Sequence, residues 1–149
     1  MADTQKMSHV ETINHEGYDP SMNLMFVPAI KVQTGKLVFL AGVTAAPPYH
    51  DHPHKPEVFD ALPRDIEGQA KLAFEHLDQA LAASGCSRTD VVSFTRFFKN
   101  VRIDQDAINR IQQEWLGGHL PVSTTVEVTG FATDPRLLLE IQAIAVAPE

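Results

Sequence analysis

The chain has 149 residues, 44% of them hydrophobic and 21% charged, which suits one compact domain and requires no second. Twelve Lys and Arg against 19 Asp and Glu give a formal net charge of −7, which argues against nucleic acid as a partner, because that binding depends on basic side chains at phosphates. The single cysteine, Cys86, excludes an intrachain disulfide, and no apolar run reaches the roughly 18 residues of a membrane span. Because the first residues also lack a secretory signal pattern, we expect a cytoplasmic protein without membrane contact.

The first part of the chain divides into an arm and the start of a domain. Residues 1–22 are polar and rich in turn formers, so we expect an N-terminal arm, followed by one domain over residues 23–149. A first strand is predicted at Ala29–Val32 and a second at Lys36–Gly42. Gly35 lies between them, and the pattern predicts that the two strands form a hairpin.

Residues 43–64 contain five prolines, which exclude a regular element and predict a long loop. Within it, the segment Tyr49-His-Asp-His-Pro-His54 holds three imidazoles, a ligand set that suits zinc or another borderline divalent cation. An imidazole of His50, His52 or His54 could also act as a general acid or base near neutral pH. Alternating histidines in a proline-bounded loop can also point apart. We therefore interpret this loop as a solvated segment or an intersubunit contact, and assign no metal and no cofactor to the chain.

Two helices are predicted, one on each side of a central strand. Asp65 is a suitable N-cap for the first helix, and Gly85 ends it. Its apolar stripe comprises Ile66, Ala70, Ala73, Phe74, Leu77 and Leu81. Val91–Phe98 is rich in β-branched and aromatic residues and reads as a strand. Asp104 is expected to cap the second helix, which Gly117 ends and whose apolar stripe comprises Ala107, Ile108, Ile111 and Trp115.

The last two predicted strands cover Ser123–Thr129 and Leu137–Val146, and a turn at Thr133–Pro135 suits an antiparallel hairpin between them. The final strand is apolar on one face and partly apolar on the other, so both faces are expected to be covered. The order strand, strand, helix, strand, helix, strand, strand predicts an α+β sandwich, a mixed sheet with both helices on one face.

The segments Leu120-Pro-Val-Ser-Thr-Thr-Val-Glu-Val128 and Leu137–Val146 resemble the C-terminal signature of the RidA/YjgF family, also called endoribonuclease L-PSP-like. Leu37–Gly42 and Asp65–Gln69 resemble further landmarks of the family, and the resemblance covers roughly Phe26–Ala147. It implies a chorismate-mutase-like fold, a homotrimer with ligand clefts between subunits, and a small-molecule substrate. Many members of the family hydrolyse enamines and imines.

Carried over by position, the family's substrate-binding arginine becomes Ser123, its catalytic glutamate becomes Gln142, and a tyrosine of the site becomes Phe26. Gly42 and Asn109 are retained. Serine supplies a neutral hydroxyl in place of a cation, and glutamine cannot act as a general base near neutral pH. The resemblance therefore implies a divergent member whose cleft differs from that of a standard 2-imino acid deaminase.

Glu140 lies two residues before Gln142 and should point to the same side of its strand, so it is the alternative catalytic base. A glutamate here also fits the family pattern without a catalytic role. For Glu127 we favour a structural hydrogen bond over a part in the chemistry. Cys86 is interpreted as a half-buried residue at a turn and Trp115 as a core residue.

Arg96 is a possible replacement for the missing cation, and the alternative is an exposed strand arginine. Ser123, Thr124 and Thr125 either form a neutral polar patch for a lactone, amide or ketone, or are ordinary strand residues. We thus predict catalytic roles for Glu140 and Gln142 and substrate contacts from Phe26, Gly42, Arg96, Asn109, Ser123, Thr124 and Thr125. The expected function is hydrolysis of a small enamine, imine or related carbonyl compound. The alternative is a noncatalytic trimeric module that binds a metabolite or a protein.

Overall fold

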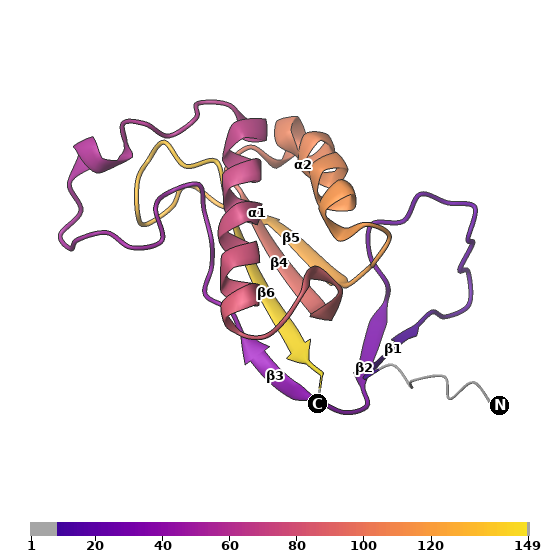
Figure 1. Ribbon diagram of the computed structural model, residues 1–149. Coiled ribbons are helices and arrows are strands. Elements are labelled where there is room, and N and C mark those ends of the chain that lie inside the picture. The colour runs from indigo at the N-terminus through magenta and orange to yellow at the C-terminus, as the bar shows by residue number, and fades with distance from the viewer. Residues whose placement is uncertain (1–8, 149) are drawn as a thin grey trace.

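The computed structural model describes residues 9–148, so residues 1–8 of the expected arm and residue 149 lie outside the described residues. Its main sheet has four strands in the order β3-β6-β4-β5. These strands are β3 (Lys36–Phe39), β6 (Leu139–Ala147), β4 (Val91–Phe98) and β5 (Val122–Glu127). Strand β6 runs antiparallel to both neighbours, whereas β5 runs parallel to β4. Both helices, α1 (Ile66–Ala83) and α2 (Val101–Leu116), cover the same face of this sheet (Figure 1), which confirms the predicted α+β architecture.

Helix α1 follows its sequence signals closely. The Asp65 side chain accepts a hydrogen bond from the backbone N–H of Gly68, as an N-cap does. The predicted stripe faces the sheet, and its buried members are Ala70, Ala73, Phe74, Leu77 and Leu81. The helix ends at Ala83, and Gly85 adopts a left-handed φ of 72° just beyond it.

Helix α2 begins at Val101, three residues before the predicted cap, so the assignment of Asp104 as N-cap is wrong. The local residue at the cap position, Asn100, makes no side-chain cap hydrogen bond. Instead, the Glu127 Oε1 on β5 accepts a hydrogen bond from the Val101 N–H at 3.1 Å. Asp104 is buried in the first turn, and burial raises the pKa of its carboxyl.

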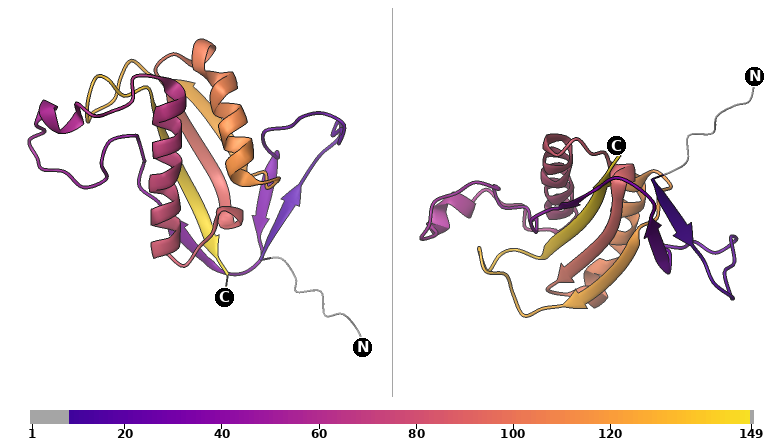
Figure 2. Two further views of the ribbon diagram at one scale, coloured as in Figure 1. Left: turned by 45° about the horizontal axis from the view of Figure 1, so that its top comes forward. Right: turned by 90° about the horizontal axis from the view of Figure 1, so that it is seen from below.

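Both predicted hairpins are wrong in their pairing. Strand β2 (Ala29–Val32) pairs with β1 (Val10–Ile13), which forms within the expected arm, and β3 pairs instead with β6. Strands β5 and β6 do not pair with each other, because β4 lies between them. Figure 2 shows the β1–β2 ribbon beyond the β5 edge of the main sheet, and the long loop of residues 43–64 projecting on the opposite side, beyond β3.

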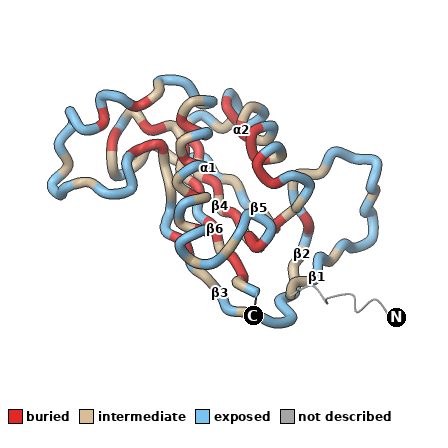
Figure 3. The backbone as a smooth tube through the Cα atoms, in the orientation of Figure 1, coloured by how far each residue is buried: buried red, intermediate tan, exposed pale blue. Residues whose placement is uncertain are grey.

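The core lies between the helices and the sheet (Figure 3). The β6 residues on this side are Leu139, Ile141, Ala143 and Ala145, each at most 1% exposed. Trp115 packs against Phe74 with ring centroids 5.0 Å apart, which confirms its assignment to the core. A second, smaller cluster lies under the long loop and comprises Ala45, Ala46, Phe59, Leu62 and Leu137. Within residues 9–148, neither helix combines the length and the apolar composition that a membrane span requires.

Candidate functional site

The sheet face opposite the helices carries the alternate residues of each strand, and we call it the open face. On β6 the residues Leu139, Ile141, Ala143 and Ala145 are buried against the helices, so Glu140, Gln142 and Ile144, which alternate with them, face the other way. Several apolar side chains on or beside this face are exposed, and Phe39 is 74% exposed. Exposed apolar side chains on one sheet face are typical of a surface that another protein chain covers.

The carboxyl group of Glu140 rests against the backbone of Gly42. A backbone bridge between Val43 and Ile141 brings these two segments together. A Cβ atom at position 42 would overlap Oε1 of Glu140 and lie 3.0 Å from its Cδ, so a larger residue there would displace the carboxyl group from this position. Burial raises the pKa of Glu140. A carboxyl group with a raised pKa suits both steps of general acid–base catalysis, accepting a proton and returning it.

Gln142 lies on the open face beside Glu140, as predicted, and its side chain is exposed. The strand register places it directly opposite Thr95, which is in turn opposite Thr124. These three residues form a polar row across β6, β4 and β5. Glu140, Gln142 and Thr124 therefore share one surface.

Arg96 lies on the other face of the sheet, between β4 and α2. Its side chain is 4% exposed, so the interpretation as an exposed strand arginine is wrong. Its Nε donates to Thr125 Oγ1 at 2.9 Å and its Nη1 donates to Asn109 Oδ1 at 2.8 Å. Burial lowers the pKa of Arg96 to about 10. The structure thus separates Arg96, Thr125 and Asn109 from Glu140.

Gln112 completes this network, and we did not predict it from the sequence. Its Oε1 accepts a weaker hydrogen bond of 3.3 Å from Arg96 Nη1, and its buried Nε2 has no hydrogen-bond partner among the described residues. The available signal was its spacing, since residues 109 and 112 share one face of α2.

Ser123 and Phe26 lie near the start of β5. The register pairs Ser123 with Phe94, which places it on the helix side, opposite to its neighbour Thr124. The backbone N–H of Val27 donates to Pro121 O at 3.2 Å, so the segment that carries Phe26 runs beside this strand end. The Phe26 side chain is 51% exposed.

Two further side chains have roles that bear on the predictions. Glu127 makes the structural hydrogen bond at the start of α2, which confirms that interpretation. Cys86 is half-buried, and burial, followed by the charge of Asp90, raises the pKa of its thiol. A thiol of this kind is a poor nucleophile because little thiolate forms.

A hollow of about 650 Å³ lies between β1 and the segment before β4, where its lining includes His9, Gln33 and His119. It contains none of the predicted site residues. The predicted catalytic pair therefore lies on the open face and not in this hollow.

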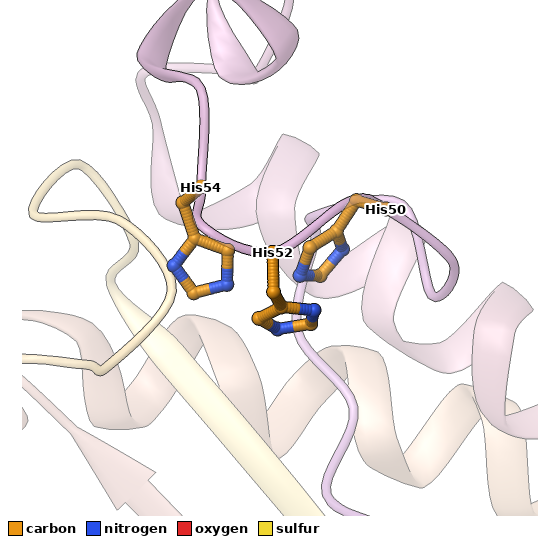
Figure 4. A group of neighbouring side chains, drawn as sticks. All are labelled: His50, His52 and His54. Carbon is orange, nitrogen blue, oxygen red and sulfur yellow. The ribbon is translucent and has the colours of Figure 1, made fainter.

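The histidines of the long loop lie close together. One ring nitrogen from each of His50, His52 and His54 lies within 4.8 Å of the other two, and Figure 4 shows the rings side by side. These side chains therefore do not point apart, while the interpretation of the loop as a solvated segment or an intersubunit contact stays a prediction.

Comparison of the chain with known proteins identifies its family. A family model described as endoribonuclease L-PSP matches residues 18–147. The chain belongs to the RidA/YjgF family. A RutC family protein of Pyrococcus abyssi is 32% identical over 117 residues, covering 78% of this chain and 82% of the relative. This confirms the membership that the sequence signature predicted.

Two further members of the RidA/YjgF family have informative descriptions. A rat protein named 2-iminobutanoate/2-iminopropanoate deaminase is 32% identical over 85 residues, which cover 57% of this chain and 60% of that protein. A crystal structure of Escherichia coli TdcF with bound serine has a TM-score of 0.62 and 28% identity, covering 78% of this chain and 85% of TdcF. The family fold is therefore shared, and one of these relatives holds a small polar molecule.

Proposed function

We propose that this RidA-family protein hydrolyses a small imine, or the enamine that isomerises to it, with Glu140 as general acid and base. The observation that carries the proposal is the carboxyl of Glu140, held against Gly42 on the open face with a raised pKa. The rat relative that is named a deaminase supports this reaction class.

The reaction converts R₂C=NH and water into R₂C=O and ammonia. Glu140 as the carboxylate accepts a proton from a water molecule while the oxygen of that water bonds to the imine carbon. The protonated Glu140 then donates that proton to the nitrogen, which gives a carbinolamine. In a second transfer Glu140 accepts the proton of the carbinolamine hydroxyl and returns it to the nitrogen, so that the C=O bond forms as the C–N bond breaks and ammonia leaves. In this proposal the amide of Gln142 and the hydroxyl of Thr124 hold the substrate or the attacking water by hydrogen bonds, as both groups can donate and accept.

The charges near the site favour a substrate without a carboxylate next to the C=N bond. Gln142 and Thr124, which share the open face with Glu140, are neutral, and Arg96 donates its hydrogen bonds on the other face of the sheet. Recognition of a carboxylate usually uses the planar fork of an arginine. We therefore infer a neutral imine or a related carbonyl compound, and not a 2-imino acid, as the preferred substrate.

The apolar open face supports a homotrimer in which neighbouring copies cover it and complete the cleft. Phe39, Leu37 and Val126 are exposed in the single chain. Covering such side chains contributes roughly 25 cal/mol per Å² of apolar surface removed from water. Light scattering should give a mass near three chains, and a monomer at micromolar concentration would contradict an intersubunit cleft.

The activity test compares two imine classes that oxidases generate in the assay. An amine oxidase acting on a primary amine without a carboxylate supplies imines without a carboxylate, here called neutral imines. An amino acid oxidase supplies 2-imino acids. We expect the protein to accelerate decay of the neutral imine more than decay of the 2-imino acid. Thr124→Arg, which places a cation on the open face, should shift this preference toward the 2-imino acid.

Glu140→Gln should lower the turnover by roughly 100-fold or more, in the range that general acid–base groups contribute. Glu75→Gln is the matched control, because Glu75 is exposed on α1. Equal turnover in Glu140→Gln and wild type would exclude the proposed role of this residue. Binding of an imine analogue without any turnover would instead identify a noncatalytic binding module.

A further inference from the structure

We propose that His50, His52 and His54 form a binding site for a divalent transition metal, with zinc as the best fit. The three residues come from one loop and belong to neither the open face nor the Arg96 network. This inference is independent of the proposed imine hydrolysis. Figure 4 shows the three rings side by side, with one nitrogen of His54 directed toward His52.

The spacing of the nitrogens is close to that of a metal site. One nitrogen from each ring lies within 4.8 Å of the other two, and neighbouring ring centroids are 4.6 to 5.1 Å apart. Nitrogen ligands of tetrahedral zinc are about 3.3 Å apart, given Zn–N bonds of about 2.0 Å. Small rotations of the rings would close this difference, and the exposed His52 is free to make one.

The hydrogen bonds of these histidines leave nitrogens available for a metal. His50 Nδ1 lies 2.7 Å from the carbonyl oxygen of Pro47. Because a carbonyl oxygen only accepts, Nδ1 must carry the proton, and the lone pair is on Nε2. A backbone carbonyl that fixes the tautomer in this way is usual for metal-ligating histidines.

His54 supplies a second observation. Its Nε2 is buried and has no hydrogen-bond partner among the described residues. A buried polar atom without a partner costs free energy, so such atoms in folded proteins normally have one. A bound metal would supply that partner.

The loop is anchored to the body of the protein at this point. Phe59 is 1% exposed in the second core cluster, and its ring packs edge-on against His50 and His54, with centroids 5.3 and 5.9 Å away. Arg136 donates to Asp60 Oδ1 and to Pro56 O, both at 2.8 Å, and so ties the end of the loop to the segment before β6. Anchored ligands lose less conformational entropy when a metal binds.

The ligand chemistry selects the class of metal. Three neutral imidazoles suit zinc, copper, nickel or cobalt, whereas magnesium and calcium prefer oxygen ligands. Three protein ligands leave one tetrahedral position for water or another small molecule. The formal charge of −7 on the chain also favours a bound cation.

The test uses full-length protein without a histidine tag, stripped of metal with a chelator and titrated with ZnCl₂ by calorimetry. We expect one zinc ion per chain with a Kd in the micromolar range or below. His52→Gln and His54→Gln should each weaken binding at least tenfold, and zinc should raise the Tm of the wild type but not of these variants.

His15→Gln is the matched control, because His15 is exposed and lies outside the cluster. It should bind zinc as the wild type does. The proposal fails if the stripped wild type binds no zinc, or if His15→Gln weakens binding as much as His52→Gln. His52 is exposed, so His52→Gln decides the question even if His54→Gln does not fold.

Discussion

Replacement of Gly42 by alanine should destabilise the protein through one contact, that with the carboxyl group of Glu140. The added Cβ would overlap Oε1 of Glu140, and its nearest neighbours are all atoms of that one side chain. Gly130 provides the matched control, because a Cβ there would meet no atom within 4 Å. Neither glycine has a positive φ, so alanine causes no backbone strain at either position.

The expected magnitude follows from two opposing effects. Overpacking costs about 1–3 kcal/mol, since either Glu140 or the backbone must move. Alanine also restricts the unfolded chain, which stabilises the folded state by about 0.4–1 kcal/mol. Gly42→Ala should therefore lower the free energy of unfolding by about 1 kcal/mol, within the roughly 0–2.6 kcal/mol that the two effects allow, whereas Gly130→Ala should raise it slightly.

Urea unfolding of a double-mutant cycle separates the contact from other effects of the substitution. Glu140→Ala removes the carboxyl, so Gly42→Ala should be neutral or stabilising in that background. All four proteins must be compared at one concentration, because assembly affects apparent stability. If Gly42→Ala changes the free energy of unfolding equally in both backgrounds, within about 0.5 kcal/mol, the two residues are uncoupled and the reasoning is wrong.

Three further predictions concern stability. Burial raises the pKa of Glu140 above its unfolded value of 4.5. The free energy of unfolding therefore falls as the pH rises from 4.5 through the folded pKa, because the charged carboxylate is disfavoured in the folded state. Glu140→Gln should thus raise the Tm at pH 7 but not below pH 4.5, and a pH-independent difference in melting would contradict this. Glu127→Ala should cost about 1 kcal/mol in urea unfolding by removing the acceptor for Val101, with Glu127→Gln recovering most of it. Phe59→Ala should cost about 3–5 kcal/mol and weaken zinc binding in calorimetry, whereas the exposed neighbour substitution Val58→Ala should do neither.

The elements that the sequence predicted best are those defined by local signals. The N-cap Asp65, the apolar stripe and Gly85 lie within one stretch of chain and together set the bounds of α1. The β-branched and aromatic run Val91–Phe98 forms β4 with the predicted bounds. In each case the residues that determine the element belong to it or lie within two residues of its ends.

Strand pairing depends on residues far apart in sequence, and there the prediction was wrong. The turn before β6 exists, with the Leu137 N–H donating to Asp134 O, yet β6 pairs with β3 and β4 and not with β5. The wrong prediction for the start of α2 has the same cause, because the side chain that accepts from the Val101 N–H is Glu127, on a later strand. Local turn and cap rules do not contain this information.

The side-chain contacts of the predicted site residues were also not predictable from local sequence, because they join different elements. Arg96 alternates with the apolar Phe94 and Phe98, a pattern typical of the buried side of a strand, but we did not predict this placement. Its partners come from α2 and β5, which no spacing along β4 reveals. The histidines were found by spacing alone, but their convergence depends on Phe59, whose contact with them is tertiary.

The position of β6 has a consequence for folding and biosynthesis. It is the last strand in the sequence, yet it lies between β3 and β4 in the sheet. Until residues 139–147 leave the ribosome, β3 has no partner in the main sheet, and β4 lacks its antiparallel neighbour. Pairing across about a hundred residues is slow compared with helix formation, so both strands have unpaired edges during synthesis. Chaperone binding to nascent chains should therefore end only after the final strand has emerged.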